Sequence, residues 1–147
     1  MSGRRTLRED VPTRRPAWQA AVDAMAVLRD ESPDCYRRVS ERMAEAPARL
    51  VVGDETLGIT ASDGIVHLRD VAPPGHLMEA TLDASSVVRL VDGTSTIEQL
   101  MALSLLDVRG HPDALLAFLG AARAVGDAGT RSAALQRIFE RFREQVG

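Results

Sequence analysis

The spacing of hydrophobic residues changes twice along this 147-residue chain, and these changes constrain its fold more than any other feature. From residue 16 to 46, apolar residues recur at intervals that place them on one face of a helix. Between residues 50 and 82 they alternate with polar residues, which is typical of strands with one buried face. Helical spacing returns after residue 83 and is interrupted once, at residues 105–109. The sequence therefore predicts a group of strands with helices on both sides of it in chain order.

Two helices are predicted before the strands. The first begins at Pro16, because proline is favoured in the first turn of a helix, and it should end near Asp30. The second follows Ser32, whose side chain can cap it, and Pro47 ends it.

Five strands are expected. Alternating segments at residues 50–52, 57–59 and 66–68 are separated by Gly53-Asp54 and by Asp63-Gly64, which are turn signals, so they predict a three-stranded meander. A fourth strand, residues 77–82, follows a break at residues 73–75. In the fifth, residues 105–109, Asp107 alternates with two apolar neighbours and should therefore lie on the outer face of the sheet.

Four further helices are predicted, two of them short and placed between the last two strands. Asp83 or Ser85 can cap the first short helix, and residues 94–96 open the second. A longer helix starts after His111, which we expect to cap it, and its apolar residues lie almost all round, so it should be buried on most sides. The last helix is expected to be capped by Thr130. It carries one apolar stripe, formed by Leu135, Ile138, Phe139, Phe142 and Val146.

Together these elements predict an α+β fold in which a single five-stranded sheet is covered by helices, with an additional helix at the N-terminus. The length fits one domain with a core of its own. We assign residues 16–147 to this domain. Residues 1–15 show no hydrophobic period and contain five arginines, so they are expected to form a flexible basic tail.

The composition excludes several classes of protein. All 18 basic residues are arginine, so lysine-dependent chemistry such as Schiff-base formation is excluded, and the absence of asparagine excludes a cysteine–histidine–asparagine triad. Cys35 is the single cysteine, and neither a secretory signal nor a membrane span is recognisable, so we expect a cytoplasmic protein. With a net charge of −3 and 3% aromatic residues, nucleic acid is not an expected partner.

Residues 80–119 resemble the closing half of a sterol carrier protein type 2 domain. In that family a strand leads into a capped helix and a glycine, then a short helix leads into the penultimate strand and a second glycine. Here the corresponding residues are Thr81-Leu82-Asp83, Asp92-Gly93, Leu106-Asp107-Val108 and Gly110. The resemblance extends back to about Cys35. The chain departs from the family pattern at Ser104, where glycine is usual, and at His111-Pro112, where an acidic residue is usual.

The resemblance implies a carrier-type module that binds an apolar, lipid-like or polyketide-like small molecule in a cavity between the sheet and the helices, without a cofactor. The same side chains could instead complete an ordinary core, as they would in any α+β fold. The residues expected to line the cavity are apolar members of the predicted strands and helices, namely Met43, Leu57, Ile59, Val66, Met78, Leu103, Phe118, Leu135, Phe139 and Phe142.

The alternative hypothesis is a small enzyme or accessory protein of bacterial specialised metabolism that uses this cavity to bind and convert an intermediate. This hypothesis takes account of the basic residues, which are all arginine, because such a composition is typical of proteins from high-GC bacteria. Acid–base catalysis would then fall to His76, or to His67 with Asp70, because histidine titrates near neutral pH. The histidines and the cysteine lack the close spacing of metal ligands, so no metal site is predicted. The sequence leaves open a homodimer, a partner protein and a purely structural interaction domain.

Overall fold

The computed structural model describes residues 15–146, so the predicted flexibility of residues 1–14 concerns a part of the chain outside the described residues. Arg15, the last residue of the predicted tail, forms an ion pair with Asp70 at 3.1 Å. The described elements are, in chain order, α2 (Pro16–Glu31), α3 (Pro33–Glu45), β1 (Ala48–Val52), β2 (Glu55–Ser62), β3 (Ile65–Arg69), β4 (Met78–Leu82), α4 (Ala84–Val91), α5 (Ile97–Ala102), β5 (Leu106–Gly110), α6 (Pro112–Gly129) and α7 (Ala133–Val146).

The five strands form one sheet in the order β3-β2-β1-β4-β5. The predicted meander is confirmed, because β1, β2 and β3 pair with their chain neighbours in antiparallel register. β4 then pairs with β1 in parallel, and β5 pairs with β4 antiparallel. The predicted fold class is therefore confirmed: a single five-stranded α+β sheet with helices, preceded by the N-terminal helix α2.

The two hairpins of the meander are closed by two-residue turns at the predicted places. Asp63 and Gly64 both have positive φ, 54° and 76°, which is the combination that a type I′ turn requires. In the β1–β2 turn only Gly53 has positive φ, 61°, and glycine adopts this conformation without steric cost. These turns fix the register in which one face of each strand becomes apolar.

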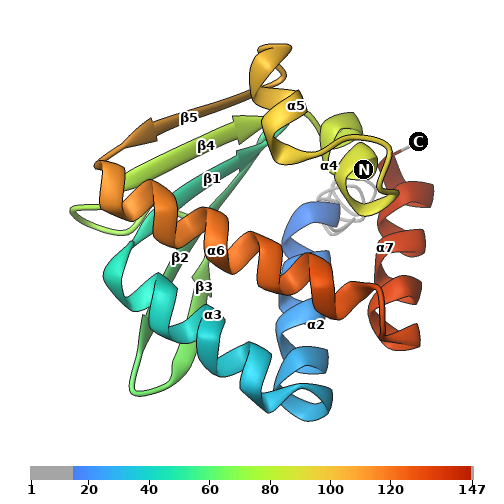
Figure 1. Ribbon diagram of the computed structural model, residues 1–147, viewed down its shortest axis with the longest axis horizontal. Coiled ribbons are helices and arrows are strands. Elements are labelled where there is room, and N and C mark those ends of the chain that lie inside the picture. Colours follow the sequence, from blue (N-terminus) through green and yellow to red (C-terminus); the bar gives the residue numbers. More distant parts are fainter. Residues whose placement is uncertain (1–14, 147) are drawn as a thin grey trace, which may run out of the picture.

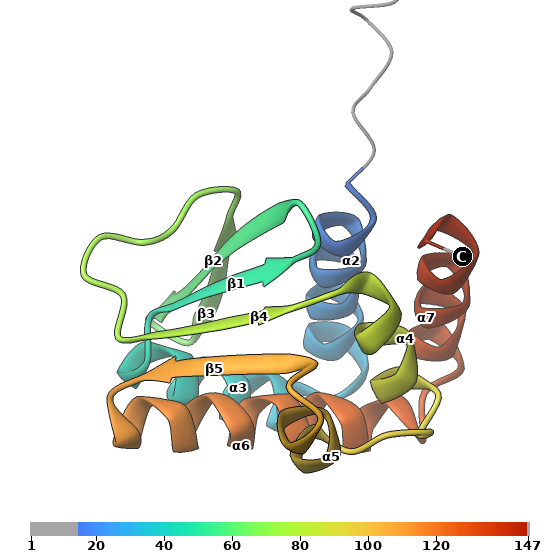
Figure 2. The same ribbon diagram turned by 90° about the horizontal axis from the view of Figure 1, so that it is seen from above.

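The helices lie on one side and at one end of the sheet. Figures 1 and 2 show α3 and α6 crossing one face of the sheet, while α2 and α7 stand side by side near the end at which β1 and β4 finish. No helix of residues 15–146 covers the opposite face, which we call the open face. Asp107 is exposed, between the buried Leu106 and the half-buried Val108, as the alternation predicts.

The expectation that the long helix is buried on most sides is wrong. The buried residues of α6 are small ones, Ala114, Ala117, Ala121, Ala128 and Gly129, whereas Leu116 is 67% exposed. Small side chains allow two helix backbones to approach closely, and α6 packs against α3 more extensively than any other pair of elements in the described chain. A Cβ atom added at Gly120 would lie 3.2 Å from the guanidinium of Arg42 on α3. Close helix packing, rather than apolar volume, therefore decides which face of α6 is buried.

Several predicted caps are also corrected. Thr96 caps α5 through a capping box with Gln99, and the ring of His111 accepts a hydrogen bond from the backbone of Asp113, both as expected. α7 is capped by Ser132, whose Oγ accepts from the Leu135 amide at 3.1 Å, and not by Thr130, which ends α6. Ser32 and Asp83 occupy the N-cap positions of α3 and α4, but their side chains form no capping hydrogen bond.

Candidate ligand-binding site

Most of the residues expected to line a cavity gather on the covered face of the sheet. Met43, Leu57, Met78 and Phe142, each at most 3% exposed, are buried in one cluster, here called the first cluster. They come from α3, β2, β4 and α7, which lie far apart in the sequence. The half-buried side chains of Ile59, Val66 and Phe118 pack against the same cluster.

A second cluster lies between the helices at the end of the sheet. Leu135 is buried there with Leu28 and Ile138, and Phe139 packs against it. The two clusters meet at half-buried side chains that contact both, among them Met25, Cys35, Val66 and Val125. The predicted lining residues therefore divide between two adjoining apolar regions rather than surrounding one.

Leu103 does not belong to either region. Its side chain is 60% exposed after the end of α5, and it packs against neither cluster. It was expected to line the cavity because it continues the helical apolar spacing of residues 97–103, but α5 ends at Ala102. Leu103 therefore cannot line a cavity enclosed by these two clusters.

Leu50 is the informative residue that the sequence analysis did not assign to the site. It lies in the middle of β1, the central strand, on the covered face between Ala48 and Val52, which are buried. Its neighbours in register, Leu57 and Ala80, are 1% and 0% exposed, yet Leu50 itself is only half-buried. Its alternation with Val52 shows which face it lies on, but not whether another side chain fills the space above it.

Further half-buried apolar side chains of the first cluster come from the elements around the end of the sheet. α4 contributes no fully buried large apolar residue, although four of its apolar residues, Ala84 among them, pack against the cluster. The larger of these half-buried residues are Trp18 and Met25 of α2, Val87, Val88 and Leu90 of α4, and Val146 of α7. The packing is thus looser at this end of the sheet than around Met43 and Met78.

A separate depression of about 230 Å³ lies at the opposite end of the sheet. Glu45, Leu77, His111, Asp113 and Ala114 line it, at the end of α3, the start of β4 and the start of α6. The ring of His111 is already used as the cap of α6. This depression does not include any of the predicted lining residues.

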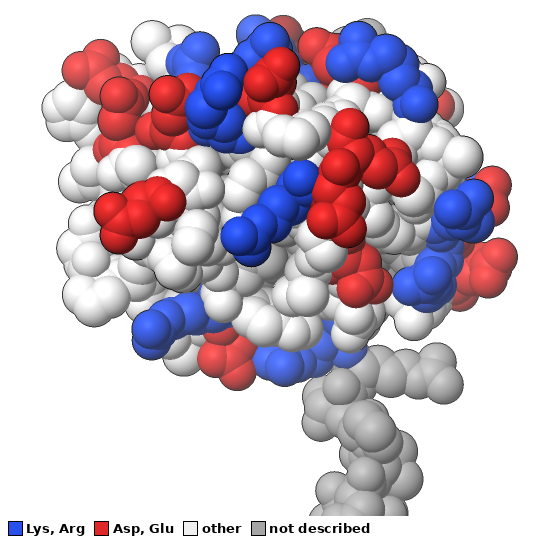
Figure 3. All heavy atoms as spheres, turned by 90° about the horizontal axis from the view of Figure 1, so that it is seen from below, with Lys and Arg blue, Asp and Glu red and all other residues white. Residues whose placement is uncertain are grey.

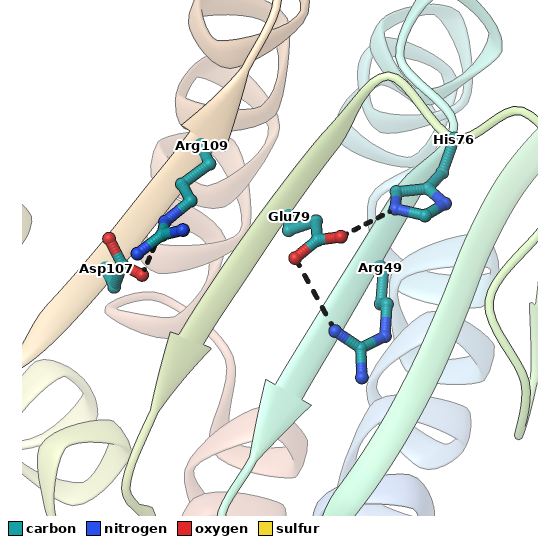
Figure 4. A network of polar contacts seen from close by, with 5 residues as sticks. All are labelled: Arg49, His76, Glu79, Asp107 and Arg109. Carbon is teal, nitrogen blue, oxygen red and sulfur yellow. Dashed lines mark hydrogen bonds and ion pairs between the residues drawn. The ribbon is translucent and has the colours of Figure 1, made fainter.

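The histidines proposed for acid–base chemistry lie on the open face, away from both clusters. His67 is exposed and lies 3.0 Å from the hydroxyl of Ser62, whereas Asp70 pairs with Arg15, so His67 and Asp70 do not form the expected pair. In Figure 4, Glu79 lies between His76 and Arg49. His76 Nε2 donates to Glu79 Oε1 at 2.9 Å, and Arg49 Nη1 lies 3.5 Å from Glu79 Oε2.

The His76–Glu79–Arg49 contacts form a surface network with an electrostatic consequence for Glu79. The hydrogen bond from His76 lowers the pKa of the Glu79 carboxyl, and the charges of Arg49 and Arg109 act in the same direction. Arg109 itself pairs with Asp107 at 3.0 Å, beside this network (Figure 4). The network therefore keeps Glu79 ionised and joins β1, β4 and the loop before β4.

Cys35 is situated differently, where the two clusters meet. Its Sγ donates a hydrogen bond to the carbonyl of Ala124 at 3.3 Å. Burial raises the pKa of the Cys35 thiol, and the charges of Arg38 and Arg131 oppose that shift. The thiol is thus a small apolar neighbour of the clusters rather than an activated nucleophile.

Among residues 15–146, no three side chains of His, Cys, Asp or Glu come close enough to hold a metal ion. On the face seen from below in Figure 3, acidic and basic side chains are interspersed, so this face offers no continuous positive surface for a nucleic-acid backbone. Within the same residues, each helix is too short or insufficiently apolar to span a membrane.

No protein-family model and no curated protein sequence matches this chain. Several solved structures are similar to it. A UbiJ-SCP2 ubiquinone synthesis protein aligns with a TM-score of 0.58 and 17% identity, over 83% of this chain and 98% of the other. Sterol carrier protein domain 2 of Helicoverpa armigera aligns with a TM-score of 0.55 and 13% identity, over 74% and 86% of the two chains.

Sterol carrier protein 2 from Yarrowia lipolytica aligns with a TM-score of 0.52 and 20% identity, over 75% of this chain and 89% of the other. A match to the sec-alkylsulfatase Pisa1 from a Pseudomonas species is partial, with a TM-score of 0.47, and spans only 14% of that longer chain. This chain therefore has the fold of the sterol carrier protein 2 domains.

Proposed function

We propose that this protein binds an apolar small molecule between the covered face of its sheet and the helices, as a carrier-type module. The observation that carries the proposal is Leu50, which stays half-buried at the centre of the covered face although its neighbours in register are fully buried. A side chain in that position is expected to be buried unless the layer above it leaves space. Such space beneath apolar side chains favours a ligand with a hydrocarbon surface.

The surrounding residues support holding a ligand rather than converting it. The half-buried apolar side chains of the first cluster offer a ligand a hydrocarbon surface. His67 and His76 contact Ser62 and Glu79 on the open face, on the far side of the sheet from Leu50, and Asp70 pairs with Arg15. A ligand above Leu50 would thus lie on the other side of the sheet from His67 and His76.

One comparison favours a second role. The structure with the UbiJ-SCP2 name is described as a ubiquinone synthesis protein and aligns with 83% of this chain. A domain of this fold can therefore take part in the biosynthesis of an apolar molecule. We propose as the alternative that this protein is an accessory protein of such a pathway and presents the bound intermediate to an enzyme.

The test is to fill the proposed space and to measure binding of the uncharged probe Nile red, whose fluorescence rises in apolar surroundings. Leu50→Trp should abolish the fluorescence increase while the protein unfolds at nearly the same temperature, because the larger side chain enters space that is already there. Native mass spectrometry of the freshly purified protein should show a bound apolar molecule, and a biosynthetic intermediate there would favour the accessory role.

Two matched variants control for the size of the new side chain. Val51→Trp places the same residue on the open face and should leave Nile red binding unchanged. Leu57→Trp places it where the packing is complete and should destabilise the protein by about 1–3 kcal/mol. If Leu50→Trp destabilises the protein as much as Leu57→Trp does, the space above Leu50 is filled and the proposal is wrong.

A further inference from the structure

The two edges of the sheet differ in how their backbone groups are used. β3 forms one edge and β5 the other. At β3, the amide of Val66 donates to the hydroxyl of Tyr36 at 3.0 Å, and α2 and α3 both contact this strand. Figure 1 shows β5 along the outer margin of the molecule, and no strand of residues 15–146 pairs with it on its outer side. β5 is therefore the edge that a further strand can reach.

The backbone of β5 directs alternate residues towards β4 and away from the sheet. The amide of His111, directly after the strand, donates to the Leu77 carbonyl, so the residues two and four positions earlier are those that bond to β4. The N–H and C=O groups of Leu106 and Val108 thus point outward, and within residues 15–146 they have no hydrogen-bond partner. An added strand satisfies unpaired backbone groups of this kind.

A row of alternating charge crosses the open face and stops at β5. Arg49 of β1 lies opposite Glu79 of β4 in the register of the sheet, and Glu79 lies opposite Arg109 of β5. Figure 4 shows these side chains together with Asp107, which pairs with Arg109 along the same strand at 3.0 Å. The row would continue beyond Arg109 if a further strand brought a carboxylate to the next position.

β5 carries such a carboxylate itself, in an order that makes the strand self-complementary. Asp107 and Arg109 lie on either side of Val108. If a second copy pairs antiparallel about a two-fold axis at Val108, Asp107 of each copy lies opposite Arg109 of the other. An axis at residue 107 or 109 would instead place two like charges opposite each other. Opposite charges across antiparallel strands are favourable and like charges are not, so the charges select the register centred on Val108.

The helix layer beside β5 also has apolar side chains that could contact a second copy. Leu116 of α6 is 67% exposed, and Leu119 is half-buried. They share one side of α6 with Arg123, which pairs with Glu98 of α5 at 2.6 Å, so this side faces the helix that precedes β5. A two-fold axis perpendicular to the sheet keeps both covered faces on the same side. The α6 helices of two paired copies would therefore become neighbours.

From these observations we propose that the protein forms a symmetric dimer in which β5 pairs antiparallel with β5 of a second copy, so that the two sheets become one. The occupant of the edge is a second copy because the charges of this strand complement themselves. The paired strands have only five residues each and the new ion pairs are exposed, so the dimer dissociates readily to monomers. The contact does not include the proposed ligand region, and its test is independent of ligand binding.

Sedimentation velocity over a series of wild-type concentrations should show an equilibrium between monomer and dimer. Asp107→Arg and Arg109→Asp each replace the attractive pairs across the axis with like charges, so each should raise the Kd of the dimer by about tenfold or more. Glu41→Arg, at an exposed position of α3, changes the net charge as Asp107→Arg does and should leave this Kd unchanged. Thermal unfolding checks that the variants keep the stability of the wild type, because exposed ion pairs contribute little to it.

A mixture of the two β5 variants separates self-complementarity from a general effect of charge. In Asp107→Arg both charged residues of β5 are positive, and in Arg109→Asp both are negative. The mixed dimer should therefore form at concentrations at which neither variant dimerises alone. Asp107→Arg combined with Arg109→Asp in one chain exchanges the two charges and should return the Kd towards that of the wild type.

Hydrogen exchange locates the contact. The amide of Val108 should exchange more slowly as the wild-type concentration rises, whereas the amide of Leu68, at the β3 edge, should not change. A wild type that stays monomeric at every concentration would overturn the proposal. A dimer whose Kd neither β5 variant alters, or a mixture of the variants that yields no mixed dimer, would also overturn it.

Discussion

At the scale of single residues, Ser104 adopts a backbone conformation that its side chain disfavours. Its φ is 58°, in the left-handed region, and it lies in the turn between α5 and β5. Glycine is the residue that adopts such angles without a clash between Cβ and the backbone. At this position, where glycine is usual in the family that the sequence resembles, Ser104 thus adopts a backbone conformation that suits glycine better than serine.

Ser104→Gly should stabilise the protein by about 0.5–1 kcal/mol, because relief of the left-handed strain exceeds the added flexibility of the unfolded chain. Urea unfolding of both proteins measures this difference. The same substitution at Ser85, an exposed position inside α4, should have the opposite sign and a similar size. Destabilisation by both variants would show that the Ser104 side chain compensates its backbone strain in another way.

Glu79 should give the stability of the protein a specific pH dependence. Its pKa is lowered in the folded protein, first by the hydrogen bond from His76 and then by Arg49. A group with a lowered folded pKa stabilises the protein above its unfolded pKa, and this contribution is lost as the pH falls through the folded pKa. Glu79→Gln should therefore lower the stability at pH 7, and the difference from the wild type should vanish at sufficiently acid pH.

Chemical unfolding at a series of pH values checks this expectation. The control is Glu140→Gln, which changes an exposed carboxylate of α7 that forms no ion pair in the described chain. A stability difference for Glu79→Gln that does not vary with pH would mean that the network stabilises the fold by packing and not by the charge of Glu79.

At the scale of elements, the start of α2 depends on a residue from a distant strand. Both carboxylate oxygens of Glu55, at the start of β2, accept hydrogen bonds from the first turn of α2: Oε2 from the Ala17 amide at 2.9 Å and Oε1 from the Trp18 amide at 3.1 Å. The residue before the helix, Arg15, forms no side-chain cap. Glu55 thus satisfies two amides that would otherwise lack partners and places a negative charge at the positive end of the helix.

Glu55→Ala should cost about 1–2 kcal/mol and should accelerate hydrogen exchange in the first turn of α2. Glu55→Gln, which keeps one oxygen acceptor but no charge, should cost less. Glu41→Ala, an exposed acidic residue of α3, serves as the control in urea unfolding. Equal stabilities of Glu55→Ala and Glu41→Ala would show that water replaces the carboxylate at this helix terminus.

At the scale of the whole molecule, the structure divides one apolar stripe of the last helix between two regions. Phe142 enters the first cluster, over the sheet, whereas Phe139 is half-buried against the second cluster, where a Cβ atom added at Gly129 would lie 2.9 Å from its ring. At the level of sequence these residues are equivalent members of one helical face. Their different surroundings lead to different expectations for ligand binding.

Phe142→Ala should weaken Nile red binding by more than tenfold, because it removes a side chain that closes the proposed space. Phe139→Ala should change the affinity little and should reduce the thermal stability, by less than the roughly 3–5 kcal/mol that truncation of a fully packed phenylalanine costs. Fluorescence titration measures the Nile red affinity of both variants, and thermal unfolding measures their stability. Similar effects of the two substitutions on Nile red affinity would contradict the separate roles of the two clusters.

The features determined by the sequence are those that depend on neighbours along the chain. The apolar period, the turn residues and the helix starts place the helices and strands of residues 15–146 to within a few residues. The Asp63-Gly64 turn and the outward side chain of Asp107 follow in the same way. Local geometry controls these features, since alternation defines the two faces of a strand and few residues tolerate positive φ.

The tertiary structure alone decided which of these faces meet and how completely they fill the space between them. It placed β4 parallel to β1, buried the alanines of α6 instead of its leucines, used Glu55 to cap α2, and left Leu103 outside the core. It also left Leu50 half-buried in the central strand. Each of these outcomes depends on side chains that are distant in sequence. How densely a point in the core is packed depends on all the side chains around it, so a pattern among neighbours along the chain cannot predict it.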